Sequence, residues 1–387
     1  MNHKKILIIS PFFYPEPIST GKYNTDLALA LEKENHSVTM LCFHPFYPNW
    51  KIKKNNKQLK NIETIRGGSN LLFSKKTIIR RLVLEFSFAF FVLRKIKKHQ
   101  KNKDIIIPIF PPSLAFYVIF PFLKKEAKKI GIVHDLQEIH SAGKKGFIHK
   151  LVRFFIHKVE KKCFKNCNKL LFLSNEMKNE AKRLYNLNEA NLKVQYPFIT
   201  IKDSNTNDLK NLFNKEKTNI VYSGALGEKQ NPFKLYSFFD AASKKNNNLI
   251  FYFFSEGEIF KTLKNSNSNP RIIFHKLVKK DNLQELYNLS DVQIVPQKEN
   301  TSKGSLPSKL PNLLASKCKV LVITDTKSEL EELFKTYNLD QTVTSWDREI
   351  LYESLRSLII KDVNFTHQID IARKLFTIDK MIDKILL

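Results

Sequence analysis

This sequence has little cysteine and little glycine, and each shortage excludes a class of protein. Four cysteines among 387 residues are too few and too scattered for a disulfide framework, and they suit a reducing compartment. Cys163 and Cys167 lie four residues apart without a set of histidine or cysteine partners, which favours free thiols over a metal site. The ten glycines form neither a Gly-x-Gly-x-x-Gly nor a Walker loop. We therefore expect no bound metal and no bound cofactor.

Acidic residues are also scarce. Lys plus Arg total 65 and Asp plus Glu total 37, a formal net charge of +28. A surplus of this size lies on the surface and favours a polyanionic partner, which leaves nucleic acid, an anionic lipid leaflet or a phosphorylated small substrate. The richness in Lys, Asn, Ile and Phe is typical of AT-rich coding sequences, and that bias accounts for part of the charge.

We expect neither a membrane-spanning segment nor a secretory leader. The start of the chain, Met1 to Ile6, runs straight into a strand-like segment without an apolar leader core, so we expect a cytoplasmic protein. Residues 105–123 carry no charge and approach the length of a spanning helix, but prolines interrupt them. A buried strand over 105–110, a Pro-Pro turn and a short helix over 113–123 explain the segment better.

Short apolar runs alternate with helical stretches along the whole chain. This alternation predicts parallel sheets of the α/β class, covered by helices on both faces. A polar stretch, residues 202–218, interrupts the alternation and is typical of a linker. We therefore predict two doubly wound, Rossmann-like domains that face a central cleft: residues 1–200, a linker at 201–217, residues 218–365, and a helix over 366–387 that packs back toward the first domain. In such sheets ligands bind beyond the carboxyl ends of the strands.

The turn that follows the first strand of the second domain reads Ser223-Gly-Ala-Leu-Gly-Glu-Lys-Gln230. Gly224 and Gly227 allow backbone amides to approach a ligand, and Lys229 opens the next helix. An amide-lined turn with an adjacent cation is suited to phosphate. An ordinary tight turn with a solvated lysine is the alternative.

A second candidate phosphate segment is residues 304–316, which contain Pro307-Ser308-Lys309 where a helix is expected to begin. Ser308 is predicted to cap this helix, and Lys309 lies near the positive end of its dipole, where a cation is unfavourable unless an anion joins it. Glu329, after the following strand, is placed to accept hydrogen bonds from ribose hydroxyls. The alternative for Glu329 is a carboxylate that interacts with the dipole of its own helix.

Two segments of the first domain carry the remaining candidates. The Pro-rich loop after the first strand ends at Gly21 and Lys22, where a glycine permits close approach to a ligand and the lysine adds charge. Glu16 in this loop is a candidate to bind or deprotonate an acceptor hydroxyl, or it is a solvated carboxylate. A later strand ends in His134-Asp135, where the histidine contacts a sugar and the aspartate orients its ring, or where the histidine is simply a core residue.

Together these four segments resemble glycosyltransferase family 4, the retaining enzymes of GT-B architecture. The likeness covers nearly the whole chain and is greatest to the bacterial exopolysaccharide and O-antigen subgroup, including N-acetylfucosaminyl transferases. It implies that Lys229 and Lys309 hold the pyrophosphate of a nucleotide-sugar donor, which we expect to be UDP-linked. It further implies that Glu329 binds the ribose, Gly21 allows phosphate approach and His134 contacts the transferred sugar.

The sequence departs from the family pattern at two places. Ala225 stands where many members carry a phosphate-binding arginine, and Gly304 and Asn312 replace a pair of glutamates that the subgroup often lacks. No Asp-x-Asp metal signature occurs in the chain. Neutralisation of the leaving diphosphate is therefore expected from lysines and helix N-termini, without a metal.

Residues 75–103 suggest a membrane partner. This stretch contains ten Lys or Arg and one acid, Glu85, around an aromatic-rich centre over 82–93. Basic flanks on such a helix are typical of an anchor on an anionic leaflet, which suits a lipid-linked saccharide acceptor. A core helix with a solvated basic end is the alternative.

The sequence is compatible with two other functions. A nucleotide-sugar epimerase shares the architecture, but the expected cleft lacks the several acids and histidines that such a sugar site needs. A nucleic-acid-binding protein suits the charge, but no zinc finger, helix-turn-helix or RNP-like aromatic pattern is present. We therefore expect no nucleic-acid partner.

Overall fold

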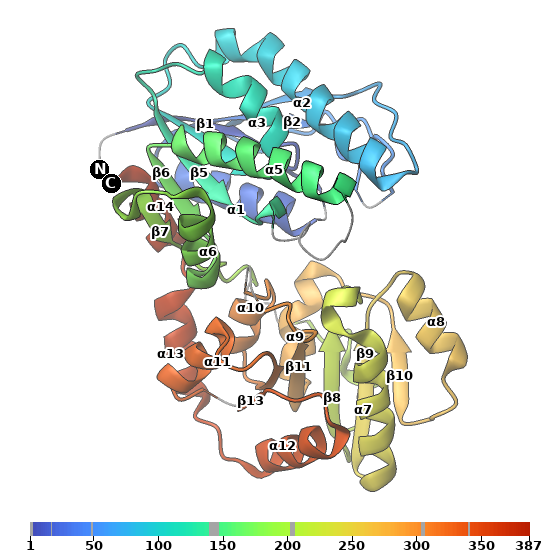
Figure 1. Ribbon diagram of the computed structural model, residues 1–387. Coiled ribbons are helices and arrows are strands. Elements are labelled where there is room, and N and C mark those ends of the chain that lie inside the picture. The colour runs from blue at the N-terminus through green and yellow to red at the C-terminus, as the bar shows by residue number, and fades with distance from the viewer. Residues whose placement is uncertain are drawn as a thin grey trace. The chain divides into compact units, whose positions relative to one another are not determined.

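The computed structural model describes residues 3–16, 18–47, 49–138, 147–201, 206–302, 306–339 and 341–387. The chain divides into two compact units. The first unit comprises Met1–Gln195 together with Ile378–Leu387, and the second comprises Tyr196–Thr377. Both are layered α/β structures, as the alternation of apolar runs predicts (Figure 1).

The first unit is built on a seven-stranded parallel sheet with the order β3-β2-β1-β4-β5-β6-β7. Its core strands are apolar on both faces, since helices cover both sides of the sheet. The strands are β1 (Lys5–Ile9), β2 (Ser37–Phe43), β3 (Ile62–Gly67), β4 (Ile105–Phe110), β5 (Lys128–Val133), β6 (Lys169–Phe172) and β7 (Leu192–Val194).

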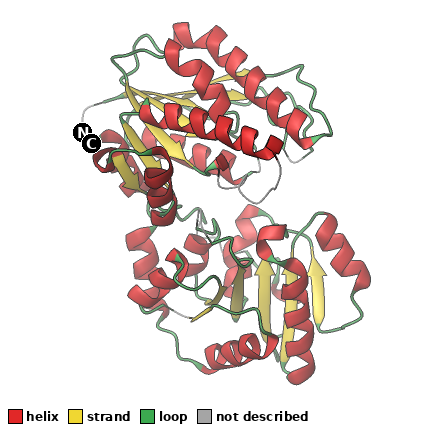
Figure 2. Ribbon diagram, in the orientation of Figure 1, coloured by secondary structure: helices red, strands yellow, loops and turns green. Residues whose placement is uncertain are grey.

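Helices α2 (Thr77–His99), α3 (Ser113–Ile119) and α5 (Phe147–Lys165) cover one face of this sheet, where Phe88, Phe116 and Phe164 join a single core cluster. Helices α1 (Ser19–Lys33) and α14 (Ile378–Leu386) lie on the opposite face (Figure 2). Helix α6 (Asn175–Tyr185) precedes β7, and the three-residue helices η1 (Phe120–Phe122) and η2 (Glu189–Asn191) complete the unit.

The second unit holds a six-stranded parallel sheet with the order β10-β9-β8-β11-β12-β13. Its strands are β8 (Thr218–Ser223), β9 (Leu249–Phe254), β10 (Ile272–His275), β11 (Val292–Pro296), β12 (Lys319–Ile323) and β13 (Gln341–Val343). In both sheets the order reverses once near the middle, between β1 and β4 in the first and between β8 and β11 in the second. Loops beyond the carboxyl ends of strands at such a reversal form the ligand site of doubly wound folds.

Two sets of helices cover the second sheet. One face packs against α7 (Pro232–Lys245), α8 (Glu258–Ser266) and α12 (Arg348–Ile360). The other packs against α9 (Leu283–Asn288), α10 (Leu310–Leu314), α11 (Glu329–Thr336) and α13 (Phe365–Leu375). Three short helices, η3 (Lys210–Leu212), η4 (Glu228–Gln230) and η5 (Lys280–Asn282), lie in loops.

The observed division differs from the predicted domain bounds in two places. The second unit begins at Tyr196, before the predicted linker, and the polar stretch packs onto this unit because Glu285 accepts hydrogen bonds from the Thr206 hydroxyl and from the amides of Asp208 and Leu209. Helix α13 also belongs to the second unit, since Ala372 and neighbouring residues enter its core. Only residues 378–387 return to the first unit.

The returning helix α14 is fixed by side chains from several elements of the first unit. The Tyr23 hydroxyl donates to the sulfur of Met381 at 2.8 Å, and Lys384 Nζ donates to the carbonyl of Val194 at 2.8 Å. Lys169 Nζ in turn donates to the carbonyl of Lys384 at 2.7 Å. The first unit is therefore completed by the last residues of the chain.

Residues 105–123 form β4, α3 and η1, so the predicted strand, turn and short helix are confirmed. Among the described residues, no helix combines the length and apolar character needed to cross a bilayer. The four cysteines are buried free thiols, as expected.

Candidate functional site

Lys309 lies at the point where the order of the second sheet reverses. Its Nζ donates to the carbonyl of Ser223 at the end of β8, at 3.1 Å, and to the carbonyl of Ile294 in β11, at 2.9 Å. The ammonium also lies 4.3 Å from the centre of the Tyr222 ring. Burial lowers the pKa of Lys309 to about 7. An amine that titrates near neutral pH is thus fixed between the two strands where such folds bind their ligands.

The predicted phosphate turn lies beside this lysine. Gly224 follows β8 with φ of +134°, a conformation that strains any residue with a Cβ, so the turn requires glycine here. The Gly227 amide donates to the Gln230 side chain at 3.0 Å. Lys229 is exposed on η4, and its carbonyl accepts the Lys298 amide at 2.8 Å. That bond ties the loop after β8 to the loop after β11.

The helix after Ser308 differs from the prediction. Helix α10 begins at Leu310 and has only five residues, and Lys309 occupies the capping position without a side-chain cap. The predicted cap by Ser308 is therefore wrong, and this side chain is exposed. A helix so short has a weak dipole, so the two carbonyls and the Tyr222 ring position Lys309 instead.

Glu329 opens helix α11, and its carboxylate is nearly buried. Its Oε1 accepts a hydrogen bond from the Tyr196 hydroxyl at 2.9 Å. Ser328 caps the helix by accepting the Glu331 amide at 3.2 Å. The carboxylate is thus oriented by a tyrosine that the sequence did not indicate, and its contact with ribose stays a prediction.

In the first unit, Glu16 is buried and does not lie in a solvated loop. Its carboxylate accepts the backbone amides of Phe46 and Tyr47, which joins the loop after β1 to the loop after β2. Burial raises the pKa of Glu16 to about 7, although the two amides and Arg66 oppose the shift. This carboxylate holds two loops together, and its action on an acceptor stays a prediction.

Packing requires a glycine at position 21, because a side chain there would collide with Glu16. A Cβ on this residue would lie 2.9 Å from Glu16 Cβ and 3.2 Å from the Glu16 carbonyl oxygen. The space beside Gly21 is therefore filled by Glu16, which the sequence did not reveal. Lys22, the next residue, is exposed in the first turn of α1.

His134 follows β5 and contacts α1. Its ring meets the Tyr23 ring edge to face with centroids 4.6 Å apart, which brings it close to the Gly21-Lys22 turn. Burial lowers the pKa of His134 to about 4, and the nearby Asp135 charge only partly opposes this. The ring is therefore neutral at physiological pH. Its Nε2 is buried without a hydrogen-bond partner, and the contact of His134 with a sugar stays a prediction.

Asp135 Oδ1 accepts the Leu136 amide at 3.0 Å, so this carboxylate shapes the chain after β5. The segment is fixed further by Glu160 of α5, which accepts the amides of Gln137 and Glu138 at 3.0 and 3.1 Å and the Tyr185 hydroxyl at 2.6 Å. Burial raises the pKa of the fully buried Glu160.

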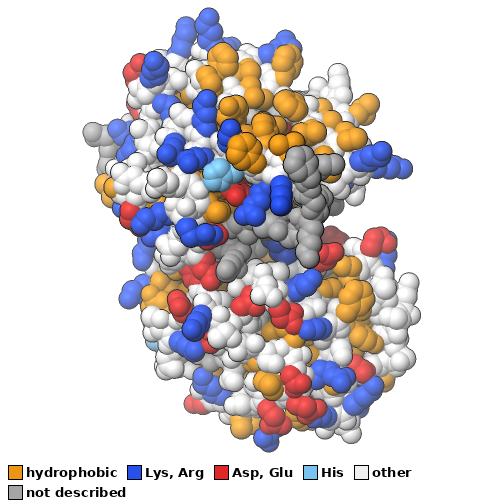
Figure 3. Space-filling view, in the orientation of Figure 1, with side chains coloured by type: hydrophobic (Ala, Val, Ile, Leu, Met, Phe, Trp, Pro, Cys, Tyr) orange, Lys and Arg blue, Asp and Glu red, His pale blue; other side chains and the backbone are white. Residues whose placement is uncertain are grey.

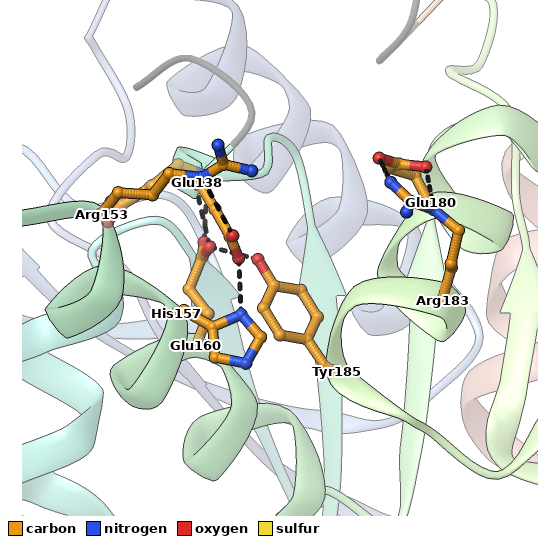
Figure 4. A network of polar contacts seen from close by, with 8 residues as sticks. Glu138, Arg153, His157, Glu160, Glu180, Arg183 and Tyr185 are labelled. Carbon is orange, nitrogen blue, oxygen red and sulfur yellow. Dashed lines mark hydrogen bonds and ion pairs between the residues drawn. The ribbon is translucent and has the colours of Figure 1, made fainter. Parts of the chain in front are cut away.

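Figure 4 shows a second carboxylate beside Glu160. Glu138 accepts from His157 Nδ1 at 2.9 Å and pairs with Arg153 at 3.3 Å. The sequence did not indicate this network, because its members come from separate segments: the chain after β5, helix α5 and helix α6. The network holds the chain after β5, the segment that carries His134, against helix α5.

The candidate residues thus form two groups. Glu16, Gly21, Lys22, His134 and Asp135 belong to the first unit, and Gly224, Gly227, Lys229, Ser308, Lys309 and Glu329 to the second. Two doubly wound sheets with candidate groups beyond strand ends define the GT-B class of sugar-transferring enzymes.

Known proteins agree with this class. The family described as Glycosyltransferase Family 4 matches residues 20–203. The colanic acid biosynthesis glycosyl transferase WcaI of Escherichia coli is 25% identical over 366 residues, which covers 86% of each chain. Of solved structures, WaaG, a glycosyltransferase involved in lipopolysaccharide biosynthesis, aligns with a TM-score of 0.70 at 13% identity, covering 98% of this chain and 99% of WaaG.

The trehalose-6-phosphate protein from E. coli bound with UDP-2-fluoro glucose has a TM-score of 0.67 at 12% identity, over 98% of each chain. At such identities the structural likeness shows the GT-B fold alone. With the family match and the relative, the chain is assigned as a glycosyltransferase, and it resembles those of family 4.

Proposed function

We propose that this enzyme transfers a sugar from a nucleotide-diphosphate sugar to a lipid-linked glycan acceptor. The reaction serves surface polysaccharide biosynthesis, as in O-antigen, capsule or exopolysaccharide. The expected donor is UDP-linked, transfer retains the anomeric configuration, and neither a metal nor a cofactor takes part. Retention and metal independence rest on the family likeness and on the lack of an Asp-x-Asp sequence.

The observation that carries the proposal is the position of Lys309. A buried ammonium costs free energy unless something compensates for it, and its two carbonyl partners leave one N–H for a further acceptor. A diphosphate beside Gly224 would supply that acceptor and its negative charge. Lys229, on the adjoining turn, adds a second cation.

These groups suit the chemistry of transfer. As the bond between the sugar C1 and the diphosphate oxygen breaks, negative charge builds on the leaving group, and the fixed Lys309 cation stabilises it. The acceptor hydroxyl oxygen bonds to C1, and its proton passes to the leaving diphosphate, which keeps the electron pair of the broken bond. In this proposal neutral His134 hydrogen-bonds the sugar, and Asp135 shapes the segment that carries it. Glu16 and Lys22 remain candidates for acceptor and phosphate contacts.

The acceptor class and location are supported by relatives and by charge. WcaI is named for colanic acid biosynthesis and WaaG for lipopolysaccharide biosynthesis, which favours a bacterial glycan acceptor. Such acceptors are built on lipid carriers, so we place the enzyme peripherally at the inner face of the plasma membrane. The charge of +28 suits an anionic leaflet.

Calorimetric titration with UDP, GDP, ADP and dTDP tests the donor site. We expect one nucleotide to bind tightly and both Lys309→Ala and Lys229→Ala to weaken it by at least about tenfold, as for lost charge-assisted hydrogen bonds. Lys319→Ala is the matched control, because Lys319 Nζ also donates to backbone carbonyls, those of Leu358, Ile359 and Lys361. No binding by any nucleotide, or equal loss in the control, would refute the assignment.

A further inference from the structure

One face of the first unit exposes an unusual number of large apolar side chains. They come from α2, α3, η1 and α5, and we call this face the α2–α3–α5 surface. Figure 3 shows hydrophobic side chains gathered there with Lys and Arg at the margins. The exposed residues are Ile78, Ile79, Leu82, Phe86, Phe90, Tyr117, Phe122, Leu151, Val152, Phe154 and Phe155.

Helix α2 is apolar on two sides. Its inner side, with Phe88, Phe91 and Val92, packs into the core. Its outer side carries Ile78, Leu82, Phe86 and Phe90 at intervals of four residues, a stripe about 18 Å long. An apolar stripe on a helix normally packs against another apolar surface, and the outer stripe of α2 has no such surface among the described residues.

Helix α5 continues this surface, which the sequence did not predict. Leu151, Phe154 and Phe155 lie on one side of α5 at intervals of three and four residues, and all are more than half exposed. Lys162 of α5 lies 5.0 Å from the centre of the Tyr117 ring of α3, which joins the two helices across the surface. The exposed patch is therefore continuous over separate segments of the chain.

Lys and Arg side chains accompany the exposed apolar residues of this surface, whereas the acidic residues of its three helices are buried. By sequence, α2 and α5 each contain six Lys or Arg, and the only acids of the three helices, Glu85 and Glu160, are buried. Lys158 lies 4.4 Å from the Phe154 ring centre and Arg94 lies 5.5 Å from that of Phe90. Each cation thus stands next to an exposed aromatic ring, the pattern of an interface between water and lipid.

This charge pattern decides between possible occupants. A second copy of the chain would place the same cations opposite one another, because a two-fold interface pairs identical patches. A nucleic acid would contact the cations but leave the central aliphatic side chains of Ile78, Leu82 and Leu151 without apolar partners. An anionic bilayer satisfies both kinds of side chain, with apolar groups among acyl chains and cations at phosphates.

We infer that the α2–α3–α5 surface as a whole binds an anionic lipid bilayer, with α5 inserting its aromatic side chains beside the stripe of α2. The inference rests on the proposed function, which places the enzyme at a membrane, and it names the surface that binds. It differs from a single-helix anchor in one testable respect: changes on α5 weaken binding as much as changes on α2.

Vesicle flotation with the full chain tests the inference. We expect binding to phosphatidylcholine vesicles that contain phosphatidylglycerol, and much weaker binding to phosphatidylcholine alone. Raising the salt from about 0.05 M to about 0.5 M should reduce binding strongly, since screening shortens the reach of surface charge. Phe154→Ser/Phe155→Ser and Phe86→Ser/Phe90→Ser should each lower partitioning by at least about tenfold.

The matched control is Phe233→Ser, which removes a phenylalanine from α7 that is 57% exposed, close to the 55% of Phe86. It should change partitioning by less than about twofold. Loss of binding only in the α2 variant would overturn the inference in favour of a single-helix anchor. Absence of vesicle binding, or a dimer that the same variants dissociate, would overturn it in favour of a protein contact.

Nucleotide calorimetry separates this inference from the proposed function. The α2 and α5 variants should bind nucleotide like the wild type, which also shows that they fold. Wild-type protein that binds nucleotide but no vesicle refutes the membrane surface and leaves the donor site standing. Protein that binds vesicles but no nucleotide refutes the donor site instead.

Discussion

Nucleotide affinity should depend on pH through Lys309. With a pKa of about 7, roughly a quarter of the Lys309 side chains carry a charge near pH 7.5 and about 3% near pH 8.5. A bound diphosphate favours the charged form and raises this pKa, so binding above pH 7 requires uptake of a proton. Affinity should therefore fall about eightfold over that pH unit. The nucleotide contributes little, because its terminal phosphate, with a pKa near 6, is already ionised.

Calorimetry near pH 7.5 and pH 8.5 measures this directly, and repeating the titration in buffers of different ionisation enthalpy counts the proton taken up. Lys309→Arg is the informative variant, since arginine stays charged throughout this range and should remove the slope. Lys229→Ala should weaken binding and keep the slope. A wild-type affinity that is constant over this range, or an unchanged slope in Lys309→Arg, would refute the reasoning.

Other perturbations test the supports of the site. Glu160→Leu should lower the free energy of unfolding by about 3–5 kcal/mol in urea titrations, because it leaves buried donors unpaired, whereas Tyr185→Phe should cost about 1 kcal/mol. Gly21→Ala should lower the melting temperature, because the added Cβ is forced against Glu16. Gly224→Ala strains the backbone of a loop and should mainly weaken nucleotide binding. The reverse pattern would contradict both assignments. Since the pKa of His134 is about 4 when folded and near 6.5 when unfolded, the unfolded state binds more protons between these values, and stability should fall as pH drops from 6.5 to 4. His134→Asn should flatten this fall in acid titrations followed by circular dichroism.

The strands and most helices were predictable because parallel strands buried on both faces leave apolar runs in the sequence. Segments such as Lys5–Ile9 and Leu249–Phe254 are of this kind. β13 was not predicted, since Gln341–Val343 is short and largely polar. The single helix predicted over residues 366–387 is two helices, α13 and α14, and the Asn364 side chain caps the first of them. A capping residue can be recognised in a sequence only when the start of its helix is already known.

The candidate site was predictable only in part. The turn at Gly224 and the segment around Lys309 stand out because they follow strands, where ligands of such folds bind. The partners of these residues do not stand out, since the two carbonyls that hold Lys309 come from strands far apart in sequence. Likewise, nothing beside Gly21 in the sequence shows that Glu16 fills its space. Sequence position indicates which loop a residue occupies, and packing decides what it touches.

Because α14 belongs to the first unit, that unit can complete its fold only after the end of the chain has been synthesised. Domains generally fold as they emerge from the ribosome, the earlier one first. Here Met381, which accepts the Tyr23 hydroxyl, lies 358 positions further along the chain, beyond the entire second unit. During translation the second unit can finish folding while the first still lacks a helix on one face. A nascent chain halted before residue 378 would therefore carry a complete second unit and an unfinished first one.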